Sequence, residues 1–310
     1  MSNYEIVIDS TCDLNAELRK KYGIYEEYLH TILYMPGKEE KVDLEWKNYS
    51  PDEFFKIAKA KVGQVKTAFA PLDEFIRVVE PILKDGKDAM VFVISSKISG
   101  TYNGYKSHAK ILLEDYPGRK IEIIDTLKYS TAGGLLAIYA AKNKAKGMEF
   151  DANVKWCNEA RYFIHESGPM DDLRFLAKNG RIAAGKAFFG QLAGVQPVAD
   201  FTRDGMSKPL GTVKGEKAAN DIALKYLLKT ARDVDGQVII IAHSCRKQRA
   251  EAFKEQLLKV ASPKEVIITH VGQSCGANIG PGLTAYFFMG EELSKDGAKE
   301  LAIFNELKGN

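Results

Sequence analysis

Hydroxyl-bearing residues gather directly after a short apolar run near the middle of the chain. The run covers residues 90–94, and residues 95–101 after it read Ser-Ser-Lys-Ile-Ser-Gly-Thr. Such a run is typical of a buried strand, and the apolar residues beyond it recur at helical spacing. Backbone N–H groups at a helix start attract anions, and nearby hydroxyls can donate to a carboxylate or phosphate. The junction therefore predicts an anion-binding site, although Ser99 acting only as a helix cap explains the residue types equally well.

Arg181 is the second residue that could bind an anion. It follows Asn179-Gly180, a pair typical of a helix C-cap, after a short helix expected near residues 170–178. An arginine in this place can bind a carboxylate through two parallel hydrogen bonds. The alternative is a solvated arginine favoured by the helix dipole, and the residue types alone favour that alternative.

Ser274 lies in a Gly-x-Ser-x-Gly pattern, which is the signature of a hydrolase nucleophile. That chemistry needs a strand, a sharp turn and then a helix, with a histidine later in the chain. A strand is expected before the pattern, but Gly280-Pro281-Gly282 follows it and is a poor helix start. No histidine follows Ser274. We therefore expect no catalytic residue here or elsewhere in the chain.

Metal and nucleotide sites have no signature in the sequence. The five histidines form no His-Glu-x-x-His pattern, and no phosphate-binding Gly-x-x-x-x-Gly-Lys-Ser/Thr loop is present. The four cysteines are scattered and form no Cys-x-x-Cys pair, which argues against structural zinc and against a disulfide framework. We expect no metal and no cofactor.

Composition excludes several classes of partner. The 44 Lys and Arg residues nearly balance the 41 Asp and Glu residues, which leaves a net charge of +3 spread along the chain. This distribution provides no footprint for nucleic acid or for an anionic membrane. The first residues lack the basic and apolar regions of a secretion signal, and no apolar run is long enough to span a bilayer. A cytoplasmic protein with no stable membrane insertion is expected.

Strands and helices alternate through the first half of the chain. Strands are expected at residues 4–8, 25–34, 90–94 and 121–124, with helices between and after them. This order predicts a parallel sheet with helices on both faces. Ligands collect at the carboxyl ends of such strands, where Asp9-Ser10, residues 95–101 and Asp125-Thr126 are expected.

The second half has a different pattern of short strands and longer helices. Strands are expected near 195–200, 207–213, 238–242 and 266–271, and helices near 215–232, 246–260 and 291–307. We place the domain boundary after residue 162, which gives domains 1–162 and 163–310. The predicted fold class is therefore α/β with two domains.

Taken together, these segments resemble the DegV family of bacterial proteins over nearly the whole chain. The resemblance rests on the following pieces: Asp9-Ser10-Thr11, Lys66-Thr67, Ser99-Gly100-Thr101-Tyr102, Asp171-Asp172-Leu173, Gly180-Arg181-Ile182 and Gly280-Pro281-Gly282. It implies an N-terminal doubly wound parallel sheet and a C-terminal α/β domain with a mixed sheet. It also implies a bound long-chain fatty acid, with its carboxylate at the domain interface and its acyl chain in an apolar tunnel. Such a protein serves as the acyl-carrying subunit of a fatty-acid kinase in phospholipid synthesis, and its partner kinase phosphorylates the carboxylate.

The resemblance also implies a set of ligand-binding residues. By position in the matching motifs these are Thr67, Ser99, Gly100, Thr101, Arg181 and Asn278. Asn278 stands where the family has a histidine, and asparagine can donate a hydrogen bond but carries no charge. The loop after Thr67 also departs from the family pattern Thr-Ser-Gln-Pro, with one more residue before Pro71.

Two other functions remain open at the level of the sequence. One is a small serine hydrolase or acyltransferase using Ser99 or Ser274, for which the sequence provides no aligned base. The other is a regulatory protein whose lipid is only structural. Because no phosphate-binding loop is present, phosphoryl transfer would belong to a separate protein.

Overall fold

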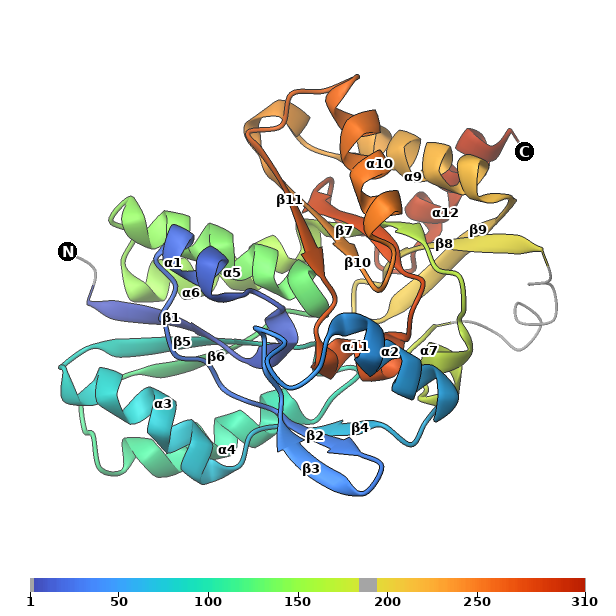
Figure 1. The fold of residues 1–310 in the computed structure, drawn as a ribbon. Helices are drawn as coiled ribbons and strands as arrows, with labels where there is room; N and C mark the ends of the chain where they lie inside the picture. Colours follow the sequence, from blue (N-terminus) through green and yellow to red (C-terminus); the bar gives the residue numbers. More distant parts are fainter. Residues whose placement is uncertain (1–2, 184–193, 310) are drawn as a thin grey trace. The chain divides into compact units, whose positions relative to one another are not determined.

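The computed structural model describes residues 3–183 and 194–309 (Figure 1). Its contacts group these residues into two compact units. The first unit contains residues 1–48, 64–161 and 272–275, and the second contains 49–63, 162–271 and 276–310. The short segment 272–275 therefore belongs to the first unit, and the segment 49–63 belongs to the second, although each is distant in sequence from most of its unit. The boundary expected after residue 162 describes two continuous domains and stays a prediction.

A parallel sheet of three strands forms the core of the first unit. Its strands stand in the order β1-β5-β6. Their bounds are β1 Tyr4–Ile8, β5 Asp88–Val93 and β6 Ile121–Asp125. Every residue from Ala89 to Val93 is fully buried, although neighbouring side chains of a strand point to opposite faces. Both faces of the sheet are therefore covered, as predicted.

Helices cover this sheet on its two sides (Figure 1). The covering helices are α3 Leu72–Lys84, α4 Thr101–Leu113, α5 Ser130–Ala145 and α6 Phe150–Ala160, with the short α1 Ala16–Tyr22 beside them. One face packs Val7, Val91 and Ile123 against Phe75 of α3 and Tyr105 of α4. The doubly wound arrangement that the sequence predicted is confirmed.

A small antiparallel sheet in the order β3-β2-β4 completes the first unit. Its strands are β2 Ile32–Met35, β3 Lys38–Lys41 and β4 Lys66–Ala68. The strand expected over residues 25–34 is wrong in its first part. Residues 25–31 instead run beside β1 with isolated bonds, such as Tyr25 N to Ile6 O at 2.8 Å and Leu29 N to Ile8 O at 3.1 Å.

The second unit is built on a mixed sheet of six strands in the order β11-β10-β12-β7-β8-β9. The strands are β7 Ile164–Pro169, β8 Val195–Phe201, β9 Ser207–Lys214, β10 Val238–His243, β11 Glu265–His270 and β12 Thr284–Met289. β10 and β11 pair in parallel, and the other neighbours pair antiparallel. This sheet confirms the predicted fold of the C-terminal half.

The helices of the second unit pack around that sheet or flank it. They are α2 Pro51–Ala60, α7 Arg174–Lys178, α9 Glu216–Thr230, α10 Lys247–Leu258 and α12 Ala298–Lys308. α2 begins with the capping box of Ser50 and Glu53 that the sequence predicts. The helix expected from residue 291 begins only at Ala298, because Gly297 adopts a φ of 73° and turns the chain just before it. No described helix is long and apolar enough to span a membrane.

Candidate functional site

The polar residues expected at one edge of the parallel sheet do meet there. The backbone N–H of Ser96 donates to Asp125 Oδ1 at 3.0 Å, which joins the ends of β5 and β6. The N–H of Asp9, directly after β1, donates to the carbonyl of Phe92 in β5 at 3.2 Å. Segments more than a hundred residues apart in sequence therefore converge, because parallel strands place their carboxyl ends on one edge.

Ser99 and Thr101 form a pair of hydroxyls at the start of α4. Their oxygens lie 2.8 Å apart, and Ser99 Oγ also accepts from the N–H of Thr101 at 3.3 Å. Gly100 between them holds the cap position and is exposed, while Thr101 is buried. Ser99 is half-buried. The N-cap of α4 is Gly100 and no side chain caps this helix, so the interpretation of Ser99 as its cap is wrong. Ser99 instead places its hydroxyl beside the start of a 13-residue helix and accepts from the Thr101 N–H.

Thr67 lies in β4, and its loop packs on the same helix α4. Thr67 is half-buried and pairs with Leu33 of β2. The ring of Phe69 rests on Gly104, where an added Cβ would lie only 2.5 Å from the ring. The N–H of Ala70 donates to the Tyr105 hydroxyl at 3.1 Å. A glycine of α4 therefore leaves room for the Phe69 ring, and the loop after Thr67 packs against the helix that begins just after Ser99.

Arg181 and Asn278 belong to the second unit, whereas Thr67, Ser99, Gly100 and Thr101 belong to the first. Arg181 is half-buried and follows Asn179, the C-cap of α7, and Gly180, which adopts a φ of 67° just after that cap, as the Asn-Gly pair predicts. The Arg181 guanidinium donates to the carbonyl of Asn179. The helix expected over 170–178 begins only at Arg174, because the Asp172 carboxylate accepts from the Arg174 N–H at 2.9 Å and forms a turn there.

The Gly-x-Ser-x-Gly segment is helical, which corrects the sequence expectation. α11 covers Gln273–Ile279 and follows β11 closely, so a strand, a turn and a helix are all present. The helix ends just before Gly280-Pro281-Gly282, so these residues terminate a helix that has already formed. Asn278 lies in its last turn. Ser274 is buried, bonds to the Thr31 hydroxyl and lies 3.3 Å from Ser10 Oγ. These partners are hydroxyls rather than a base that would activate a nucleophile.

Two buried carboxyl groups lie in the first unit near this helix. Asp9 is fully buried and its Oδ1 accepts from the Thr11 N–H at 2.9 Å, while Asp13 accepts from Ser130 Oγ at 2.5 Å. Burial raises the pKa of each carboxyl to about 7. The sequence placed Asp9 at a strand end but gave no sign that Asp13 is buried, because the contact with Ser130 spans 117 positions.

These pKa values predict how stability changes with pH. Between pH ~4 and ~7 the native carboxyls keep protons that the unfolded chain has released, so stability falls as the pH rises through this window. Asp9→Asn is expected to flatten that fall, because asparagine does not titrate. The measurement is the free energy of unfolding at several pH values for both proteins. Equal pH slopes for the two proteins would contradict the assignment.

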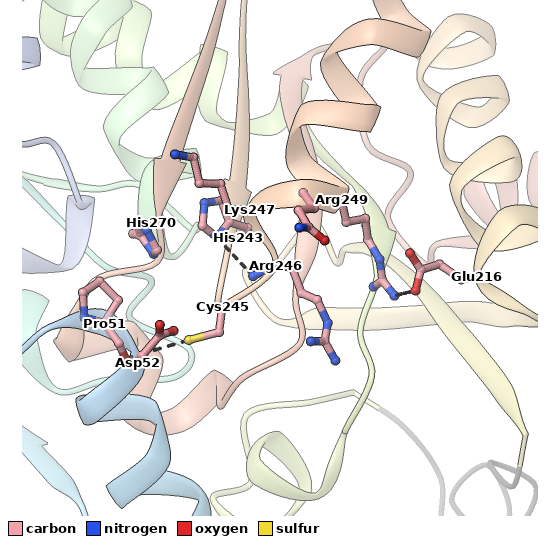
Figure 2. A pocket seen from close by; sticks show the side chains of 10 residues that line it. Pro51, Asp52, Glu216, His243, Cys245, Arg246, Lys247, Arg249 and His270 are labelled. Atoms are coloured by element: carbon pink, nitrogen blue, oxygen red, sulfur yellow. Dashed lines mark hydrogen bonds and ion pairs between the residues drawn. The ribbon is translucent and has the colours of Figure 1, made fainter.

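Two of the cavities of the protein lie within the second unit. The first measures about 480 Å³ and is drawn in Figure 2. The second measures about 730 Å³ and is lined partly by Asp171, Asp172, Leu173 and Pro281, which belong to the motifs quoted above. None of the six predicted ligand-binding residues lines either cavity.

An ion-pair network beside these cavities was missed by the sequence analysis. Arg249 is buried and binds Asp171 at 3.0 Å and Glu216 at 2.6 Å, and Arg246 also binds Asp171. The residues 244–249 read Ser-Cys-Arg-Lys-Gln-Arg between a predicted strand and a predicted helix. This is the same kind of junction as residues 95–101, and the same reasoning applied there would have singled it out.

A family model described as an uncharacterised protein of the DegV family matches residues 3–291. The chain belongs to the DegV family. A DegV domain-containing protein of Clostridium perfringens is 28% identical to it over 293 residues, which cover 94% of this chain and 99% of the relative.

Solved DegV structures share the fold of this chain. A DegV family protein of Thermus thermophilus, described for its fatty acid binding, superposes with a TM-score of 0.80 at 23% identity and covers 93% of this chain and 99% of its own. A stearic acid-binding protein of Eubacterium ventriosum gives a TM-score of 0.80 at 21% identity, covering 93% and 98%. At these identities the structures establish the fold of this DegV protein.

Proposed function

We propose that this DegV protein binds a long-chain fatty acid and presents its carboxylate to a partner kinase in the cytoplasm. One observation carries the proposal: family members of the same fold are described with bound fatty acids, including stearic acid in Eubacterium ventriosum and heptadecanoic acid in Eubacterium eligens. Family membership over residues 3–291 brings that ligand class to this chain.

The head group would be received by the hydroxyls on and near α4. A carboxylate removed from water needs several hydrogen-bond donors, because an unpaired buried charge costs many kcal/mol. Ser99 and Thr101 supply two hydroxyls 2.8 Å apart at the start of α4, and the Thr67 loop packs on the same helix through Phe69. Arg181 and Asn278 are proposed as further donors by their positions in the family motifs.

The acyl chain would provide most of the affinity. At ~0.8 kcal/mol for each buried CH₂, about fifteen methylenes offer ~12 kcal/mol before ordering costs are subtracted. The tail therefore determines how tightly the ligand binds, and the head group determines where the carboxylate is held. Because the sequence has no phosphate-binding loop, phosphoryl transfer is assigned to the partner kinase.

The direct test is to extract the ligand from the purified protein. Protein expressed in a bacterial host and never exposed to detergent is denatured, extracted with organic solvent and analysed by mass spectrometry. We expect one fatty acid for roughly each protein molecule, because burial of the tail makes dissociation slow. A protein unfolded and refolded without lipid serves as the control. An extract without acyl species would overturn the proposal.

A further inference from the structure

The cavity of about 480 Å³ lies where two parallel strands of the second unit end (Figure 2). His243 and His270 are the last residues of β10 and β11, are partners in the strand register, and have ring centroids 4.1 Å apart. Ligands of α/β sheets bind beyond the carboxyl ends of parallel strands. The cavity therefore has the position of a ligand site, and the fatty-acid proposal makes no use of it.

His243 places a hydrogen-bond donor at this cavity. The residue is only 1% exposed, and its Nδ1 accepts from the Arg246 N–H at 3.3 Å. Burial, together with His270 and Lys247, lowers the pKa of His243 to about 4, so the ring is neutral at pH 7. Since Nδ1 accepts, the single proton is on Nε2. No hydrogen bond from that N–H is present among the described residues, so it is available to a ligand in the cavity.

The first turn of α10 adds further donors to the same cavity. No side chain caps this 12-residue helix, so the N–H groups of its first turn face outward from a positive helix end. Lys247 lines the cavity, and its exposed ammonium group lies 3.9 Å from the carboxylate of Glu251 in the same helix. Arg249 also lines it, and its Nε has no hydrogen-bond acceptor among the described residues while its terminal nitrogens bind Asp171 and Glu216.

Charge alone does not select the ligand. The carboxylates of Asp52 and Glu216 line the cavity together with Arg246, Lys247 and Arg249, and Glu216 is already paired with Arg249. Across the described residues no group of His, Cys, Asp or Glu side chains has the arrangement of a metal site. The donors still available at the cavity are His243 Nε2, Arg249 Nε and the N–H groups of the first turn of α10, and they favour a ligand with several acceptor oxygens.

We propose that this cavity binds a phosphate group, either as the free ion or carried on a small organic molecule. His243 Nε2, the first turn of α10 and Lys247 donate to its oxygens. A volume of about 480 Å³ exceeds what a phosphate ion needs and falls within the range of small-molecule pockets, so an organic portion can be accommodated. The site is distinct from the Ser99 and Thr101 hydroxyls assigned to the fatty acid.

Isothermal titration calorimetry of the protein as purified tests this site with inorganic phosphate, glycerol 3-phosphate and AMP. We expect saturable binding. If either ester binds with higher affinity than inorganic phosphate, the ligand carries an organic portion. If the esters bind equally or more weakly, the ligand is the free phosphate ion. Lys247→Glu is expected to weaken binding tenfold or more, because it reverses the charge at the helix start. Lys225→Glu, an exposed reversal in α9 away from the cavity, is the matched control and should leave affinity unchanged.

A histidine variant makes the test specific to the cavity. His243→Phe keeps an aromatic ring and removes the Nε2 donor, and it should abolish most of the binding. If that buried variant fails to fold, the comparison of Lys247→Glu with Lys225→Glu decides the result. The proposal is overturned if none of the three probes binds at millimolar concentration, if Lys225→Glu weakens binding as much as Lys247→Glu does, or if loading with oleic acid displaces phosphate.

Discussion

Asp200→Ala is expected to destabilise the second unit by about 3–5 kcal/mol, because removing one member of a buried polar network leaves several donors without an acceptor. Asp200 is 1% exposed in β8. Its Oδ2 accepts from Tyr226 Oη at 2.7 Å and bonds to His165 Nδ1 at 2.6 Å, and its Oδ1 accepts from two backbone N–H groups. Alanine would leave all four donors in the core without an acceptor.

His165 explains why this carboxylate matters so much. Its second ring nitrogen, Nε2, lies 2.6 Å from the carbonyl oxygen of Glu291. The ring is therefore held between two buried oxygens, one from the Asp200 side chain and one from the backbone. Removal of Asp200 leaves Nδ1 of this buried ring without its partner, which costs the full desolvation penalty of that group.

The thermal unfolding of Asp200→Ala should be compared with that of two other variants. Glu306→Ala removes an exposed partner of Lys229 at 3.2 Å and should cost under about 1 kcal/mol, as surface ion pairs do. Asp200→Asn keeps one acceptor oxygen and should lie between the two. If Asp200→Ala unfolds at the same temperature as Glu306→Ala, the network does not stabilise the unit.

Local sequence signals predicted the elements that position the site. Ser50 and Glu53 form their capping box, Gly180 adopts the left-handed conformation just after the end of α7, and the hydroxyls after residue 94 lie between a strand and a helix. Each of these features depends on residues within a few positions of one another. The order of strands and helices along the chain was enough to predict the α/β fold class.

Elements whose pattern is set by distant contacts were missed. β7 contains His165, Glu166 and Ser167, all buried, so it shows no apolar run. Its polar side chains are satisfied by partners such as Asp200 and the carbonyl of Ala223, which lie 35 and 56 positions away. The helix around Ser274 was missed because its glycines are typical of a turn, and the hydroxyl partner Thr31 is 243 positions away.

Ser99→Ala is expected to weaken fatty-acid binding about ten- to a hundredfold if Ser99 donates to the carboxylate. That range corresponds to the ~1.5–3 kcal/mol of one charge-assisted hydrogen bond. Most of the tail burial survives the change, so some lipid should remain bound. Phosphoryl transfer with a partner kinase should fall further than affinity does, because a loosened carboxylate is no longer aligned for reaction. Thr67→Ala should likewise lower phosphoryl transfer more than it lowers fatty-acid affinity.

The bond from the Thr101 N–H to Ser99 Oγ predicts a second effect, on stability. Loss of one such hydrogen bond costs about 0.5–1.5 kcal/mol, which is measured on the lipid-free protein. Ser107→Ala is the matched control, since Ser107 is exposed in the same helix and its hydroxyl donates only to the Asn103 carbonyl at 3.2 Å. Fatty-acid affinity is then measured on all three proteins beside their stability. Lost stability with unchanged affinity and unchanged transfer would leave Ser99 only a structural role at the start of α4, and the carboxylate would have to be received by other donors.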